Sequence, residues 1–204
     1  MEIIFLQVEH CIFKVPCFQF ARHSQLFATV FTLPRPAGEE AEGWHEGSPI
    51  KLDGVSILDF ERLLKVLYPL TPVPNTPTLD ADEWMSVLKL ATKWHFLQVR
   101  DLAIRQLGEH ALSLSPVSRI VLGRQYDVST WLRSGYIELA RRKASITTEE
   151  ATKIGLEVAL EIFRLRETAM HSTRDLNPYE KIELGSLFEA EFKRADSACQ
   201  PVPP

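Results

Sequence analysis

Residues with strand-forming character are confined to the first 52 positions of this 204-residue chain, and apolar residues beyond them recur with helical spacing. Residues 3–8 and 12–15 are β-branched and aromatic runs separated by the polar pair Glu9-His10, which predicts a hairpin. Residues 50–52 predict one more short strand. Because the strands precede the helices and no βαβ unit repeats, the pattern predicts an α+β fold with a small N-terminal sheet.

Two helices are expected close to this sheet. Apolar spacing predicts the first over residues 17–32, ended by Pro34. The second has Ser56 and Asp59 at the spacing of a capping box, and Pro69 at its end. Its apolar residues meet the amphipathic template of i, i+3, i+4 and i+7 in full: they are Phe60, Leu63, Leu64 and Leu67.

The remaining helices are predicted from caps and periodicity. Asp80 with Glu83 begins a helix, and residues 97–107 continue in a second one that pairs with it. A further helix is predicted from Pro116, because proline suits the first position of a helix, and another is predicted after Ser129. One long helix is predicted from Thr147 to about residue 170, and a last helix is predicted beyond Pro178. From residue 111 onward the chain is therefore expected to be all-helical.

Prolines divide the chain into three predicted parts. Residues 35–49 are polar, glycine-rich and flanked by proline, so they are expected to form a mobile insertion. Proline recurs over residues 69–78, where a central strand is improbable because proline donates no ladder hydrogen bond. The expected organisation is an α+β domain over 1–110, a helical extension over 111–170, and a C-terminal helix with a disordered tail over 171–204.

Composition narrows the class of protein. With 23 basic and 27 acidic side chains the formal charge is −4, which gives no net drive toward phosphate backbones or anionic lipid, so neither nucleic acid nor membrane is expected as a partner. No apolar stretch approaches the roughly 20 residues of a membrane span. Three cysteines without a CxxC pair fit a reducing compartment, and the protein is expected to be intracellular, in nucleus or cytoplasm alike.

Catalytic and metal-binding signatures are missing from the sequence. There is no G-x-S-x-G elbow, P-loop, G-x-G-x-x-G or H-E-x-x-H motif, so neither catalytic residues nor a cofactor is expected. Cys11, Cys17 and His23 lack a fourth partner for a tetrahedral metal site, and no metal is expected. One alternative is kept: a small enzyme that uses His45 and Glu46 of the 35–49 loop.

The densest positive cluster lies in the expected helical extension. Its members are Arg133, Arg141, Arg142 and Lys143, with Arg119 and Arg124 upstream. The cluster would suit nucleic acid or an acidic partner. We favour a structural interpretation, because cations at a helix C-terminus stabilise the helix dipole by about 0.3–1 kcal/mol each without any ligand.

Several strings of the sequence resemble the BTB/POZ family. They are VEHCIFKVP over residues 8–16, SQLF over 24–27, IKL over 50–52 and DFERLLKVLYP over 59–69. With EWMSVLKLATKWHF over 83–96, they are similar to a fungal branch of the family, and the resemblance covers about 1–110. Residues 118–142 resemble the BACK-type helices that follow such domains.

The resemblance implies a BTB/POZ-like fold and a non-enzymatic protein–protein interaction module. Members of the family self-associate, and they serve as adaptors for ubiquitin ligases or for transcriptional assemblies. Protein partners, a homodimer and a cullin-type scaffold are therefore expectations. Residues 69–78 replace a strand that is common in the family, so the family's cullin contacts in this region do not transfer to this chain.

The predicted interface lies on the first helix. Its apolar arc is wider than a lone hairpin can cover, which favours a partner-facing edge. In BTB proteins the corresponding helix contributes to dimer contacts. The candidate interface residues are Phe20, Leu26, Phe27, Val30 and Phe31.

Overall fold

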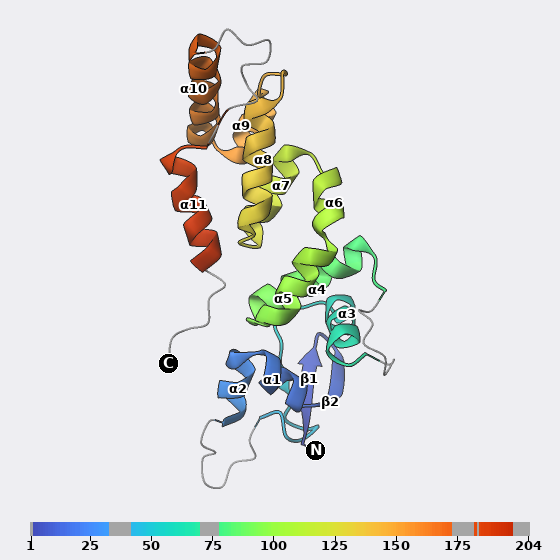
Figure 1. Ribbon diagram of the computed structural model, residues 1–204. Helices are drawn as coiled ribbons and strands as arrows, with labels where there is room; N and C mark the ends of the chain where they lie inside the picture. The colour runs from blue at the N-terminus through green and yellow to red at the C-terminus, as the bar shows by residue number, and fades with distance from the viewer. Residues whose placement is uncertain (1, 33–41, 70–77, 173–181, 183, 198–204) are drawn as a thin grey trace. The chain divides into compact units, whose positions relative to one another are not determined.

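The computed structural model describes residues 2–32, 42–69, 78–172, 182 and 184–197 (Figure 1). It is mostly helical with one three-stranded sheet, which confirms the α+β class. The chain divides into two compact units, Met1–Leu107 and Gly108–Pro204, which are described separately. The first contains the sheet, and the regular elements among the described residues of the second are all helices.

The sheet of the N-terminal unit has the strand order β2-β1-β3. Strands β1 (Ile3–Val8) and β2 (Cys11–Pro16) form the predicted antiparallel hairpin, and β3 (Ile50–Lys51) pairs in parallel with β1. Alternate side chains of β1 point into the core, where Ile4, Leu6 and Val8 are fully buried. The predicted hairpin and short strand are therefore confirmed.

The single helix predicted over residues 17–32 is wrong, because two helices replace it. Helix α1 (Phe18–His23) ends at Ser24, whose backbone is extended, and α2 (Gln25–Thr32) follows. The buried Ser24 hydroxyl donates to the carbonyl of Trp94 at 2.7 Å and accepts from the amide of Phe27 at 3.2 Å. A tertiary hydrogen bond thus holds the break, and the same side chain caps α2.

Three helices complete the N-terminal unit: α3 (Ile57–Leu67), α4 (Ala81–Lys93) and α5 (Leu97–Gln106). The cap predicted at Ser56 is present, since its hydroxyl accepts from the amide of Asp59 at 3.1 Å. Asp80 and Glu83 form the full reciprocal capping box. An aromatic cluster forms the centre of this unit: Phe20, Phe27, Phe60, Trp94 and Phe96.

Part of the expected insertion is anchored to the sheet. Phe5 donates its amide to the carbonyl of Gly43 at 2.7 Å, and Gly43 donates to the carbonyl of Ser48 at 2.6 Å. Gly43 has φ +89°, and a Cβ there would lie 2.6 Å from Cδ1 of Ile50, so only glycine fits. Three predicted segments lie outside the described residues: 33–41 of the insertion, the proline-rich link 70–77 and the tail 198–204. The mobility expected of the insertion there and the disorder expected of the tail stay predictions.

The C-terminal unit contains six described helices. They are α6 (Gly108–Ser113), α7 (Pro116–Gln125), α8 (Ser129–Arg141), α9 (Thr148–Ile154), α10 (Leu156–Ser172) and α11 (Ser186–Ser197). Helix α6 was not predicted, whereas the caps at Ser115 and at Thr147 with Glu150 form as expected. The core of this unit is built around Tyr136, Phe188 and Phe192, all essentially fully buried.

The long helix predicted from Thr147 to about residue 170 is also wrong. It is interrupted at Gly155, which has φ +95°. In a continuous helix the carbonyl of Ile154 would accept from the amide of residue 158. Here Nη1 of Arg124 donates to that carbonyl at 2.6 Å. A side chain from another helix therefore replaces the backbone hydrogen bond that is lost at the break.

Helices α7 and α8 approach closely through two glycines. A Cβ on Gly123 would lie 2.9 Å from Cγ of Leu132, and one on Gly135 would lie 2.8 Å from the carbonyl oxygen of Pro116. Both glycines therefore serve as contact points between the helices. Within the described part of the chain, no helix has both the length and the apolarity to cross a bilayer.

Candidate functional site

The five candidate interface residues fall into two groups. Phe20 is fully buried, and its ring centroid lies 5.0 Å from that of Phe27 and 5.8 Å from that of Phe96. Phe27 is buried as well. Both rings therefore belong to the core of the N-terminal unit, where α1 places Phe20 and α2 places Phe27, and a partner cannot reach them.

The outward residues are Leu26 and Val30, one turn apart on α2 and 46% and 40% exposed. We call this pair the α2 surface. Phe31 is half-buried, with its ring 6.3 Å from that of Trp44, which comes from the anchored end of the insertion. A partner-facing role of the α2 surface stays a prediction.

Most arginines of the basic cluster form ion pairs or hydrogen bonds within the C-terminal unit. Arg119 pairs with Glu138 from α7 to α8, and Arg133 donates to Glu189 of α11 at 3.1 Å. Arg141 donates to the carbonyl of Ile182 at 3.2 Å. These pairs tie helices together, which favours the structural interpretation of the cluster over a nucleic-acid surface.

Arg142 adds a further tie, which fixes α9 to the end of α8. Its Nη1 donates to Oε1 of Glu150 at 2.8 Å, and its Nη2 donates to the other carboxylate oxygen. Glu150 also accepts from the amide of Thr147 at 2.9 Å in the capping box. The guanidinium hydrogen bond, together with the capping amide, lowers the pKa of Glu150 from its ordinary value of 4.5 to about 2.

This pair predicts an acid-sensitive contribution to stability. Above pH 4.5 the carboxylate is ionised in both the folded and unfolded states, so its contribution is fully present. As the pH falls from 4.5 to about 2, the unfolded chain binds the proton first and the contribution is lost. We expect Glu150→Gln to lower the free energy of unfolding at pH 7 and to flatten its decline over that window, as measured by urea unfolding at a series of pH values. An equally steep decline in the variant would contradict the assignment.

A second polar cluster joins α7, α8 and α11. Nε of Arg124 donates to Oε1 of Glu191 at 2.7 Å, and Nη2 donates to the hydroxyl of Tyr136 at 2.8 Å. Tyr136 in turn donates to Oε2 of Glu191 at 2.6 Å. Burial, reinforced by this bond to the carboxylate, raises the pKa of Tyr136 well above its ordinary value.

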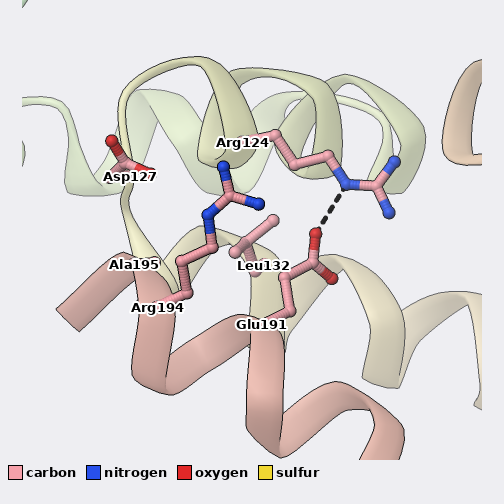
Figure 2. Close-up of a pocket in the computed structure, with 6 residues that line it drawn as sticks. All are labelled: Arg124, Asp127, Leu132, Glu191, Arg194 and Ala195. Atoms are coloured by element: carbon pink, nitrogen blue, oxygen red, sulfur yellow. Dashed lines mark hydrogen bonds and ion pairs between the residues drawn. The ribbon is translucent and has the colours of Figure 1, made fainter. Parts of the chain in front are cut away.

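A pocket of about 230 Å³ opens beside this cluster (Figure 2). It is lined by Arg124, Asp127, Leu132, Glu191, Arg194 and Ala195. Figure 2 shows the paired side chains of Arg124 and Glu191, with the side chain of Arg194 to one side of them. Among the described residues, the lining includes no serine, threonine, cysteine, histidine or lysine, which are the nucleophiles that covalent catalysis most often uses.

Other expected chemical groups lie apart from this pocket. Cys11 and Cys17 are free thiols in the N-terminal unit, and burial is the main cause that raises the pKa of Cys17. Among the described residues, no group of three or more His, Cys, Asp or Glu side chains is placed to hold a metal ion. His45 and Glu46 are both exposed.

One surface was missed by the reasoning from sequence. Four large apolar side chains on α10 are exposed, and we call them the α10 stripe: Leu156 (69%), Leu160 (50%), Phe163 (43%) and Met170 (60%). Their spacing of 4, 3 and 7 residues places them on one helix face. That spacing was the signal available in the sequence.

Comparisons with known proteins add no family to this description. The chain matches no protein-family model, no curated protein and no solved structure.

Proposed function

We propose that the chain is a non-enzymatic protein–protein interaction module of the BTB/POZ type, with the α2 surface as its partner-facing edge. The order of elements supports this proposal: a hairpin, a helical segment, a short strand and then helices follow one another, as in the order expected from the sequence, although the helical segment is divided into α1 and α2. The observation that carries it is the exposure of Leu26 and Val30 directly beside the buried Phe27. Burying such aliphatic side chains against another protein is the main source of affinity in interfaces of this kind.

The proposed role is that of an adaptor, which brings other proteins to a ubiquitin ligase or to a transcriptional assembly. Co-purification from cells separates the two, since the first predicts a cullin among the retained proteins and the second predicts association with chromatin. The α2 surface serves a second copy of the chain or a different protein in either case. Nucleic acid and membrane are not proposed as partners.

Self-association through the α2 surface is tested by light scattering coupled to size-exclusion chromatography. We expect the double variant Leu26→Glu/Val30→Glu to have a lower mass than the unmodified chain at equal concentration, because two carboxylates are too costly to bury in an apolar contact. Leu58→Glu is the matched control, since Leu58 is 55% exposed on α3 of the same unit. Equal masses for the double variant and the unmodified chain would count against self-association through this surface.

The alternative of a small enzyme built on the 35–49 loop has weaker support. His45 and Glu46 are exposed at the turn, where water solvates both side chains, whereas a general base is usually tuned by burial or by charged neighbours. Glu46→Gln would abolish any activity that depends on this loop, which gives the alternative a direct test.

A further inference from the structure

The α10 stripe is the most exposed apolar face among the described helices of the C-terminal unit. The side of α10 that borders the stripe packs into its own unit through Ala159, Ile162 and Arg166, all buried. Arg166 donates to the carbonyls of Ala144 at 2.9 Å and Lys143 at 3.1 Å, so the orientation of the helix is fixed. These contacts fix the rotation of α10 about its axis and leave the adjoining stripe at the surface.

We propose that the α10 stripe pairs with the α10 stripe of a second copy of this chain, with the two helices antiparallel about a two-fold axis. This contact is separate from the α2 surface, and it does not depend on the proposed function. The stripe residues alternate in steps of four and three along the helix, the pattern that lets two helices pack side by side through one face. In one register, Leu160 of each copy contacts Phe163 of the other. The two-fold axis therefore produces this apolar contact twice.

Charge complementarity at the edge of the stripe supports a second copy as the occupant. Glu157 and Arg164 are both exposed and are seven residues apart, close to two helical turns, so they lie on the same border of the stripe. In the register above, Glu157 of each copy faces Arg164 of the other, because the two helices run in opposite directions. Arg164 already lies 3.5 Å from Glu161 of its own helix, so each interhelical contact brings a second carboxylate to this exposed guanidinium instead of a like charge.

The one charged residue within the stripe also fits this arrangement. Glu167 shares the face with the apolar residues and is exposed. The same register places it beside Leu156 of the second copy, which is the first residue of α10. A carboxylate is stabilised near a helix N-terminus, where unpaired amides carry partial positive charge. A parallel pair would instead place Glu167 against Glu167.

The size of the contact sets its expected strength. One pair of helices of this length buries less than the roughly 1,600 Å² of a standard interface. The pairing is therefore expected to be reversible, with a dissociation constant on the order of micromolar to hundreds of micromolar.

The test is a charge exchange, measured by analytical ultracentrifugation of the full chain over a range of concentrations. To keep the α2 surface from contributing, all proteins carry Leu26→Glu/Val30→Glu. We expect this parent to dimerise, and we expect Glu157→Arg alone or Arg164→Glu alone to weaken dimerisation about tenfold, because each exchanges two attractions for two repulsions. Mixing the two single variants restores opposite charges in both pairs, so the mixture is expected to form a heterodimer about as tightly as the parent.

Two further variants complete the design. Phe163→Glu is expected to abolish the dimer, whereas Leu112→Glu, at a residue 66% exposed on α6 of the same unit, is expected to leave it unchanged. A mixture that associates no better than its components would overturn the proposal. So would a parent that stays monomeric at about 1 mM, in which case another part of the same chain or a different protein covers the stripe. A tight dimer insensitive to Phe163→Glu would overturn it as well.

Discussion

Replacing Phe20 with alanine is expected to destabilise the N-terminal unit by about 3–5 kcal/mol, the range measured for large aromatic residues removed from a core. Phe20 is fully buried, and its ring packs edge-on against those of Phe27 and Phe96 and lies 6.3 Å from that of Phe60. The loss therefore combines the transfer free energy of the ring with a cavity bounded by other rings, which are too rigid to collapse into it. Hydrogen exchange with mass spectrometry, which resolves the two units, measures the change.

The matched control for this prediction is Leu26→Ala. Leu26 lies in the next helix and was predicted from sequence to share an interface with Phe20, but its side chain is 46% exposed. Surface substitutions of this kind usually change the free energy of unfolding by about 0.5 kcal/mol or less. Comparable losses of protection for the two variants would contradict the division of the candidate residues into core and surface.

Replacing Gly135 with alanine is expected to destabilise the C-terminal unit by about 1–3 kcal/mol, although alanine is the better helix former by about 1 kcal/mol. The added Cβ would lie 2.8 Å from the carbonyl oxygen of Pro116 and 2.7 Å from Cγ1 of Ile120. The side chain of Ile120 can rotate, but the carbonyl belongs to the backbone of α7, so the two helices must move apart. Urea unfolding of the full chain, with hydrogen exchange to locate the change, measures the effect.

Gly108→Ala provides the control for the glycine prediction. Gly108 begins α6, and a Cβ there meets no other atom within 4 Å. Its substitution is expected to be neutral or to raise the free energy of unfolding, because alanine restricts the unfolded chain more than glycine does. If Gly135→Ala were equally harmless, the close contact of α7 and α8 would not limit packing in this unit.

Local signals in the sequence predicted where many elements begin. The capping residues at Ser56, Asp80, Ser115 and Thr147 all cap helices as expected, because a cap requires only side chains and amides within one turn. The hairpin followed from two short β-branched runs around a polar turn. The positions of these elements along the chain could therefore be predicted without knowing which other elements pack against them.

Two helix breaks were not predicted, and both depend on distant residues. Ser24 binds the carbonyl of Trp94, 70 positions along the chain, and the carbonyl of Ile154 is bound by Arg124 from another helix. Apolar periodicity continues through each break, so the pattern alone favours one long helix. Gly155 offered a local hint, since glycine tolerates the φ of +95° found there, but a single glycine does not by itself end a helix.

The sequence by itself determined the α+β class, the hairpin and the helix caps, because short-range hydrogen bonds and apolar periodicity specify them. Only the tertiary structure decided which apolar residues face outward. Phe20 and Leu26 are equally apolar in the sequence, yet one lies in the core and the other at the surface, and the stripe on α10 remains uncovered. The physical reason is that burial depends on which helix packs against which, and those contacts join residues far apart in the chain.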